Sequence, residues 1–399
     1  MIDPLAWIDD EAAEWSARGL ARGLDSHGPV EPGRFVRKGR TYINFGANDY
    51  LGLAADPRVV EAAQSAAKLY GWGAGASALV CGWTEAHQRL AEALAAFEHA
   101  EAAHLFPTGY AANLGTVAAL VERGDVVYSD RLNHACLIDG VRLSGASLRV
   151  FPHNDVGRLG SILERDKGRF RRSLIATEGV FSMDGDLAPL AGLADLAEGF
   201  DAILLVDEAH ATGLLGPDGQ GASSACGVSG RVHVRVGTLS KAIGSLGGFV
   251  VGSRRLIDWL VNHARTQIYS TSLPAAAASA ALEALKIATA EPWRRRQVLA
   301  HAIRVRTALR ERGLDVGTSV GPIVPVILGE SERVICFAEK FRSQGFFVPA
   351  IRPPTVPAGT ARLRICLSAA HTESDVDSLI EVMTRDPDLR DVANERRDR

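Results

Sequence analysis

Short apolar runs alternate with helical or loop stretches along the middle of the chain, from Gly124 onward. Strands separated by helices are typical of α/β layers around a mostly parallel sheet. Binding sites in such sheets lie at the carboxyl ends of the strands, so the polar residues that follow each run are the first candidates for chemistry. The runs read DVVYSD, SLRVFPHND, SLIATEGVFSMDGD, AILLVDEAH, HVRVGTLSK and GGFVVGS.

Helical spacing dominates on the amino-terminal side of this alternation. Apolar positions between Met1 and about Asp25 predict a surface helix, on which Arg18 and Arg22 lie four residues apart and face one direction. Further on, Pro107-Thr108-Gly109 forms a turn that leads into a helix predicted to end at Gly124. A helix start after a glycine offers free N–H groups to a phosphate, and an ordinary glycine turn is the alternative.

A second domain is expected after the alternation. Pro274 opens an alanine-rich helix and Pro292 marks its exit, which places a domain join close by. Beyond it, RLRICL alternates like a strand and turns Arg362 and Arg364 to one face. Such an arginine can bind a carboxylate with two hydrogen bonds, although spacing alone favours an ordinary surface charge. The predicted organisation is a helical segment at 1–45, a large domain at 46–288, a small α/β domain at 289–385 and a frayed tail at 386–399.

Composition narrows the class of protein. The chain has 399 residues, of which 47% are hydrophobic and 23% charged, as expected for a globular enzyme with more than one core. A net charge of -3 does not indicate a nucleic-acid partner. The five cysteines are scattered without a CxxC pair, which favours a reducing compartment and argues against a disulfide framework or a zinc site. We find neither a signal peptide nor an apolar run of the roughly 18 residues that a membrane span needs, so a cytoplasmic location is expected.

The strongest chemical signal is a lysine among small residues, Lys241 in GTLSKAIGSLGG. About thirty residues upstream, a hydrophobic run ends in Asp207 and His210. Glycines leave room for a bulky group against the backbone, and a strand-end acid can hold a charge deep in a pocket. Together these residues suggest a pyridoxal 5'-phosphate (PLP) site, with Lys241 as the covalent partner and Asp207 as the partner of the pyridine nitrogen. Other polar residues at strand ends are His134, Ser182 and Thr238.

Two other functions suggested by short motifs are not supported by the rest of the sequence. DEAH at Asp207 to His210 spells a helicase motif, but the GxxxxGK(S/T) loop that such a motor needs is missing from the sequence. The glycine-rich stretch Gly71 to Gly82 does not spell GxGxxG after a strand, so a dinucleotide site is unsupported. Asn48, in an Asn-Asp turn, is either turn chemistry or a polar group aimed into a site, and turn chemistry is the simpler interpretation.

Over nearly its whole length the chain resembles the α-oxoamine synthases of PLP-dependent fold type I. Several long motifs in the right order make this resemblance specific. They are NDYLGL (48–53), TGYAAN (108–113), NHACL (133–137), TEGVFSMDGD (177–186), VDEAHATG (206–213), TLSKAIG (238–244), IYSTSLP (268–274) and RPPTVPAGTARLRI (352–365). The resemblance implies a large domain with a mixed, mostly parallel sheet and a smaller C-terminal α/β domain.

The resemblance also implies a role for each matching residue. Lys241 matches the lysine that holds PLP and later moves the substrate α-proton, and Asp207 matches the acid that keeps the pyridine nitrogen protonated. His134 matches the histidine stacked on the PLP ring, and His210 the residue at the ring oxygen. Further cofactor positions are Gly109, Tyr110, Ser182, Thr238 and Thr271, the last in a segment that reaches the partner subunit's phosphate. Substrate positions are Arg364 for the amino-acid carboxylate, Arg22 and Thr355 for the acyl group, and Asn48 and His134.

Within the family, RPPTVPAGTARLRI implies the branch that condenses L-alanine with a pimeloyl thioester, on CoA or a carrier protein, in a homodimer with shared active sites. A glycine C-acetyltransferase and a sphingoid-type acyltransferase are the alternatives inside the family, and a non-catalytic PLP-binding homologue is the alternative outside it. The chain departs from many relatives in its glycine loop, where GAGASA replaces GSGGSR. Ala76 and Ala78 thus stand for a glycine and an arginine, a change that bears on how the acyl substrate is held.

Overall fold

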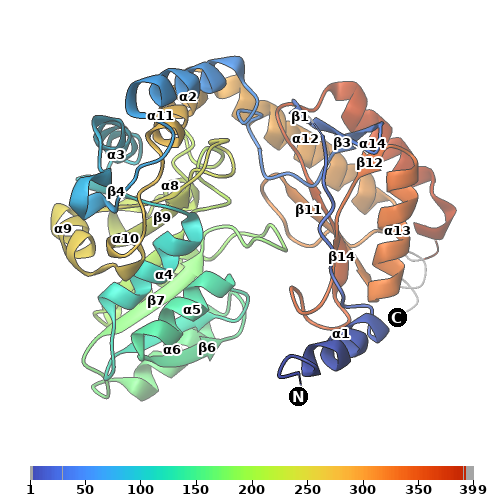
Figure 1. Cartoon of the computed structure of the whole chain (residues 1–399). Coiled ribbons are helices and arrows are strands. Elements are labelled where there is room, and N and C mark those ends of the chain that lie inside the picture. Colours follow the sequence, from blue (N-terminus) through green and yellow to red (C-terminus); the bar gives the residue numbers. More distant parts are fainter. Residues whose placement is uncertain (1–2, 29, 390, 392–399) are drawn as a thin grey trace.

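The computed structural model describes residues 3–28, 30–389 and 391, and its strands form three sheets. Figure 1 shows two halves joined at the top, one around a seven-stranded sheet and the other around the carboxyl-terminal strands. The large sheet has the order β4-β10-β9-β8-β7-β5-β6. Its strands are β4 (Ala102–Phe106), β5 (Val126–Asp130), β6 (Ser147–Phe151), β7 (Ser173–Glu178), β8 (Ile203–Asp207), β9 (Val234–Thr238) and β10 (Gly248–Gly252).

Each predicted run in the middle of the chain is a strand of this sheet. The strands β6, β5, β7, β8 and β9 pair in parallel, whereas β10 is antiparallel to both of its neighbours, β9 and β4. The sheet is therefore mixed and mostly parallel, which confirms the predicted fold class. The central strands are almost completely buried because helices cover both faces.

Alternation along each strand sends side chains into two different cores. Tyr128 and Ile175 pack with α6 (Val156–Asp166) and α7 (Leu190–Gly199) on one face. Their neighbours, such as Val127, pack with helices on the other face. Those helices are α4 (Gly109–Leu120), α5 (Ala135–Ser144) and α9 (Arg254–His263).

Further helices complete this half. A capping box at Thr84, in which Nδ1 of His87 accepts the Thr84 backbone N–H at 3.1 Å, starts α3. The alanine-rich helix α11 follows Pro274 as predicted. The bounds are α2 (Pro57–Tyr70), the π-helix η1 (Ala78–Gly82), α3 (Glu85–Phe97), α8 (Ala222–Ala225), the 3-10 helix η2 (Ser229–Arg231), α10 (Arg265–Ile268) and α11 (Ala275–Ala290).

The other half contains two small sheets. One has the order β11-β14-β13 and is antiparallel, and the other has the order β1-β2-β3-β12. The pairing of β12 with β3 is parallel and joins Phe346 to Ile43, so the strands β1 to β3 belong to the carboxyl-terminal half. The elements are β1 (Val30–Glu31), β2 (Arg34–Arg37), β3 (Arg40–Asn44), α12 (Pro292–Glu311), β11 (Ile323–Gly329), α13 (Ser331–Ser343), β12 (Phe346–Phe347), β13 (Ala350–Ile351), β14 (Ala361–Cys366) and α14 (Glu373–Arg385).

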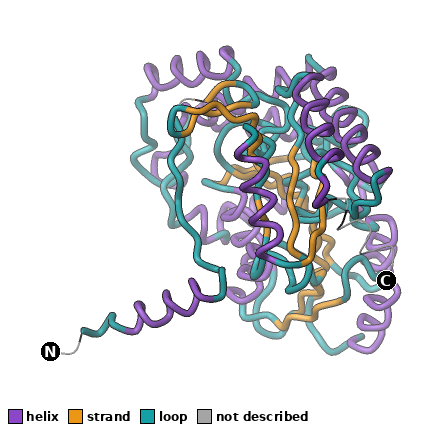
Figure 2. Tube along the Cα trace, turned by 90° about the vertical axis from the view of Figure 1, so that its right-hand side faces the viewer, coloured by secondary structure: helices purple, strands orange, loops and turns teal. Residues whose placement is uncertain are grey.

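The amino-terminal prediction was too helical. The helix α1 (Trp7–Ala17) ends before Arg18 and not near Asp25, and the strands β1 to β3 follow it. The helix buries none of its residues, and Figure 2 shows it standing out from the body of the molecule. With no packing to extend it, the chain turns at Gly19 (φ +63°). Arg22 therefore lies in the connecting loop and does not share a helix face with Arg18.

Three other boundaries differ from the prediction. The helix α4 ends at Leu120 and not at Gly124, because Val121 is already extended. The helix α12 was not predicted from the sequence, because arginines interrupt its apolar positions. The predicted frayed tail begins with packed residues: Leu389 is 1% exposed and Lys340 lies 2.6 Å from Asp386. The rest of that tail, 390 and 392–399, lies outside the described residues.

Within the described part of the chain, we find no helix that combines the length and the apolar character of a membrane span.

Candidate active site

The carboxyl ends of β7, β8 and β9 meet the start of α4 around a cavity of about 240 Å³. This is the edge of the sheet at which α/β proteins bind ligands. The cavity contains most of the residues that the sequence placed at strand ends. Its lining comprises Thr108, Gly109, Tyr110, Asn113, His134, Cys136, Glu178, Asp207, Ala209, His210, Thr238, Ser240 and Lys241.

Lys241 follows β9, and its Nζ lies 2.8 Å from Nε2 of His210. Burial lowers the pKa of Lys241 and holds the pKa of His210 well below its usual value. A neutral His210 can accept the lysine N–H. On the other side of this ring, the Tyr50 hydroxyl lies 2.7 Å from Nδ1. The lysine is thus held by a buried, neutral hydrogen-bonding chain and has a lowered cost of losing its proton.

Asp207 ends β8 and is only 4% exposed. Its Oδ2 accepts a 2.7 Å hydrogen bond from Nδ2 of Asn113, and its Oδ1 accepts from the Ala209 backbone N–H at 2.9 Å. Both of these donors are neutral, so they orient the carboxylate without neutralising it. The arrangement leaves Asp207 able to stabilise a cation inside the cavity.

His134 caps the start of α5 and presents a ring to the same cavity. Its Nδ1 lies 2.9 Å from Sγ of Cys136 and accepts the Cys136 backbone N–H at 3.3 Å. The Tyr110 ring packs edge-on against it with centroids 6.2 Å apart. Burial lowers the pKa of His134, so the ring is a neutral, fixed plane against which a flat ligand can stack.

The start of α4 closes the cavity with backbone. The Thr108 side chain accepts from the Ala111 N–H and caps the helix, while the first N–H groups after it remain available to a ligand. A Cβ added at Gly109 would lie 3.1 Å from the Thr238 side chain, so any other residue would push against Thr238. The helix terminus is a suitable cradle for a phosphate.

The residues present fit PLP. Lys241, the His134 ring and the Asp207 carboxylate supply a nucleophile, a stacking plane and a partner for a positive ring nitrogen. Asn113 Oδ1 and Glu178 Oε1 are buried without a hydrogen-bond partner in the described structure, and both residues line the cavity. Unsatisfied buried acceptors of this kind are expected where a polar ligand supplies the missing partners.

Arg364 is buried and is not a surface charge, contrary to the interpretation that spacing favoured. It is 5% exposed, and its Nε donates to the Ser182 carbonyl at 2.7 Å. Its Nη1 donates to Oδ1 of Asn48 at 3.2 Å, across 316 positions of the chain, and neither residue lines the lysine cavity. Arg362, on the same strand, is 3% exposed and pairs with Asp184. A buried arginine beside an amide is a ready carboxylate partner.

Arg22 and Thr355 lie together in a second, larger cavity of about 610 Å³. Nη2 of Arg22 donates to Oγ1 of Thr355 at 3.0 Å, although 333 positions separate the two residues. Arg352 fixes the passing amino-terminal chain by donating to the Ala21 carbonyl at 2.8 Å. We call this the arginine cavity; its lining does not include Lys241.

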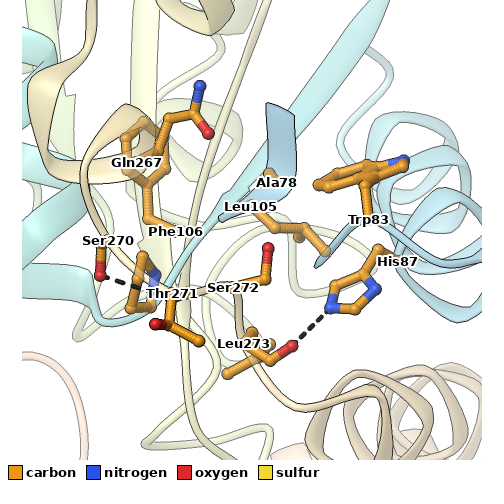
Figure 3. A pocket seen from close by; sticks show the side chains of 11 residues that line it. Ala78, Trp83, His87, Leu105, Phe106, Gln267, Ser270, Thr271, Ser272 and Leu273 are labelled. Carbon is orange, nitrogen blue, oxygen red and sulfur yellow. Dashed lines mark hydrogen bonds between the residues drawn. The ribbon is translucent and has the colours of Figure 1, made fainter. Parts of the chain in front are cut away.

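Thr271 and Ser182 do not line the lysine cavity. Thr271 is exposed and belongs to a separate pocket shown in Figure 3, where Ser270 donates to its carbonyl at 3.3 Å. The same picture shows Nε2 of His87 2.6 Å from the Leu273 carbonyl, a contact that fixes the loop. A bridge from Thr271 to Ser77 ties this loop to the glycine-rich stretch. Ser182 contributes its carbonyl to Arg364 and its N–H to Glu178.

Four functional positions were missed from the sequence. Asn113 orients Asp207, Tyr50 contacts His210, and Glu178 and Cys136 line the lysine cavity. Asn113 lies one helical turn after Gly109 in TGYAAN, so helical spacing could have identified it. Burial raises the pKa of Glu178 to about 8, an effect that no local pattern reveals.

Comparison with known proteins gives the family. The family model for aminotransferase class I and II matches residues 40–383. The 8-amino-7-oxononanoate synthase of Anaeromyxobacter dehalogenans is 48% identical over 95% of each chain. That of Alcanivorax borkumensis is 50% identical over 87% of this chain and 89% of its own.

Solved structures agree. A serine palmitoyltransferase from S. paucimobilis, solved with a PLP adduct, superposes with a TM-score of 0.91 at 30% identity and 99% coverage of both chains. The 8-amino-7-oxononanoate synthase of Francisella tularensis gives a TM-score of 0.74 at 28% identity, covering 86% of this chain and 97% of its own.

Proposed function

The chain belongs to the class I and II aminotransferase family, among its PLP-dependent 8-amino-7-oxononanoate synthases, and we propose that it condenses L-alanine with a pimeloyl thioester. The products are 8-amino-7-oxononanoate, CO2 and the free thiol, a step of biotin biosynthesis. The observation that carries this proposal is that Lys241, Asp207 and His134 line one cavity at the strand ends. When bound, PLP supplies an aldehyde for covalent attachment and a cationic ring that stabilises negative charge on the adjoining carbon.

Four residues would bind and orient the cofactor. Asp207, oriented by Asn113, would hold the proton on the pyridine nitrogen, and His134 would pack against the ring. His210 would contact the ring oxygen, supported by its place beside Lys241. Other contacts to the cofactor are assigned to Gly109, Tyr110, Ser182, Thr238 and Lys241.

Lys241 would move the proton at Cα of alanine. Its pKa is lowered by burial, so the amine can take a proton closer to neutral pH than an exposed lysine can. Arg364 and Asn48 would bind the alanine carboxylate; they contact each other at 3.2 Å, and Arg364 is 5% exposed. Fixing the carboxylate orients the Cα–H bond toward the lysine.

The arginine cavity would receive the acyl donor. Arg22 and Thr355 supply a cationic and a hydroxyl donor in a space large enough for a chain-like group. We propose that the boundary between the large and the small domain lies at residue 288. The cofactor residues then belong to the large domain, and Thr355 of the acyl subsite belongs to the small domain.

A homodimer would complete the site. Thr271 is exposed and lies away from the lysine cavity of its own chain, in a loop that would contact the partner subunit's phosphate. Exposed apolar side chains lie in this loop and in the glycine-rich stretch that is bridged to it: Tyr269, Val80 and Trp72 are 72%, 77% and 78% exposed. A partner surface would cover them. All five cysteines are free thiols, which supports a cytoplasmic enzyme.

A product assay tests the function. Purified protein with PLP is given alanine, glycine or serine, each with pimeloyl, acetyl, succinyl or palmitoyl thioesters, on CoA and on acyl carrier protein. We expect thiol release and 8-amino-7-oxononanoate only with alanine and pimeloyl, and none from Lys241→Ala. The structural likeness to serine palmitoyltransferase makes serine with palmitoyl the second candidate. Turnover of that pair, or of glycine with acetyl-CoA, in place of alanine with pimeloyl refutes the assignment.

A further inference from the structure

His153 lies between two acids at the carboxyl edge of the large sheet, and the chemistry above does not use it. Its Nδ1 is 3.0 Å from Oδ1 of Asp130, and its Nε2 is 2.8 Å from Oδ2 of Asp186. The two acids are 1% and 7% exposed. Because a carboxylate oxygen only accepts, two such contacts require a proton on each ring nitrogen. The geometry therefore contains an imidazolium held between two buried carboxylates.

Each acid belongs to a different active-site segment. Asp130 ends β5, and its Oδ1 also accepts the Leu132 N–H at 2.8 Å, in the loop that leads to His134. Asp186 closes the turn that begins at Phe181, since the Phe181 N–H donates to the Asp186 carbonyl at 3.0 Å. We call residues 181–186 the connecting turn. His153 thus ties this turn to the β5 strand end.

The other side of the connecting turn meets the carboxyl-terminal half. Its Ser182 carbonyl accepts from Nε of Arg364 at 2.7 Å, and its Asp184 pairs with Arg362. The Val320 N–H donates to the Gly185 carbonyl at 2.9 Å, and a Cβ at Gly185 would lie 2.8 Å from the Ile323 carbonyl. These contacts restrict the connecting turn on the side of the carboxyl-terminal half. Its position therefore depends on Arg362 and Arg364 of β14 and on His153.

We propose that His153 is a positioning residue which, through the connecting turn, aligns Arg364 for the carboxylate of the amino-acid substrate. The role of Arg364 rests on the proposed function. Without the imidazolium, Asp130 and Asp186 repel each other, the turn shifts, and the Ser182 carbonyl no longer holds the guanidinium. The side chains of Asp130 and Asp186 supply the charges that face the ring, and Phe181 packs edge-on with centroids 4.4 Å apart. Their hydrogen bonds raise the pKa of His153 to about 10 despite its partial burial, which agrees with a permanent positive charge.

The test is a binding measurement on the PLP-loaded enzyme. Alanine is titrated without acyl donor, and its Kd is read from the spectral change of the bound cofactor. In His153→Phe, which keeps a ring against Phe181, we expect the alanine Kd to rise about tenfold, or about 1.4 kcal/mol. The KM for the acyl thioester should stay within about twofold, because the lining of the arginine cavity does not include the connecting turn. His263→Phe, an exposed histidine on α9, is the matched control.

A second background separates positioning from general loss of structure. In an Arg364→Lys enzyme, adding His153→Phe should change the alanine Kd by less than about twofold, because the two residues act on one interaction. Equal weakening of alanine, PLP and acyl-donor binding would overturn the proposal, as would an alanine Kd unchanged by His153→Phe. If His153→Phe does not fold, His153→Gln, which also leaves the two carboxylates without a cation between them, takes its place with the same expectations. A wild-type enzyme that binds no alanine at all refutes the proposed function instead.

Discussion

The lysine cavity and the arginine cavity are assembled in opposite ways. In the first, most polar side chains follow buried strands of one mostly parallel sheet, so their positions are determined within a few residues of local sequence. In the second, Arg22 reaches Thr355 across 333 positions, and the amino-terminal loop is held by Arg352. We infer that the lysine cavity suits a cofactor that stays bound, whereas the arginine cavity suits a substrate that binds and is released.

This difference predicts a division of function between the two cavities. Residues of the lysine cavity should affect turnover and cofactor attachment, because neutral hydrogen bonds fix Asp207 and Lys241 there. Residues of the arginine cavity should affect the affinity for the acyl donor and leave the cofactor untouched. Each substitution below can support or break this division.

The largest expected effect is that of Lys241→Ala. Losing both the covalent anchor and the proton carrier should lower kcat by about 10³-fold or more. Thiol release from the pimeloyl thioester measures it. Lys286→Ala, a surface lysine that pairs with Glu283 at 3.2 Å, is the control and should keep normal turnover. A Lys241→Ala enzyme with more than a tenth of normal activity would be incompatible with the assigned site.

Asp207→Asn should rank next. The substitution keeps the shape but removes the charge that holds a proton on the pyridine nitrogen, so kcat should fall about 10²-fold, near 3 kcal/mol. The KM for the acyl donor should change little. Asp201→Asn provides the control, because Asp201 is exposed and asparagine tolerates its positive φ of 51°. Equal losses in both variants would remove the special role of Asp207.

The sequence predicted the lysine cavity better than the arginine cavity. Long apolar runs located β5 to β10 and thereby placed His134, Asp207, His210, Thr238 and Lys241 at one sheet edge. The fold class, the cofactor and the family followed from these motifs. Local patterns of this kind are readable because the strand period and the strand-end rule act over a few residues.

Contacts between segments far apart in the sequence could not be predicted from local patterns. The pairing of β3 with β12 turned a predicted helical segment into part of a sheet, and β14 buried Arg364 against the Ser182 carbonyl. The overlooked helix α12 carries many arginines, so its amphipathic pattern is weak. His153 and Asn113 act only through residues far away in sequence. In each case tertiary packing, and not local preference, determines the structure.

Arg22→Ala tests the arginine cavity. The loss of a guanidinium donor should raise the KM for the acyl thioester about tenfold, within the range of a hydrogen bond to a charged group. The alanine Kd and PLP occupancy should not change. Arg18→Ala, four residues earlier with a 60% exposed side chain, is the matched control. A fall in PLP occupancy of Arg22→Ala would erase the distinction between the two cavities.

The smallest expected effect is a shift in pH dependence. Covalent attachment of PLP needs the neutral amine of Lys241, whose pKa burial lowers from the ordinary value of 10.5. The attachment rate should therefore rise with pH and level off below pH 10.5, as measured by stopped-flow absorbance. The Asp207 charge opposes this lowering, so Asp207→Asn should move the plateau to still lower pH. A plateau at or above the ordinary lysine pKa would mean that burial does not act on Lys241.

The central claim is that PLP is bound covalently by Lys241, and borohydride reduction tests it most directly. Protein saturated with PLP is reduced, digested and analysed by mass spectrometry, with Lys241→Ala in parallel. The account predicts one pyridoxyl group per chain, on Lys241, and none in the variant. An unmodified Lys241, or a pyridoxyl group on another lysine in both proteins, would contradict it.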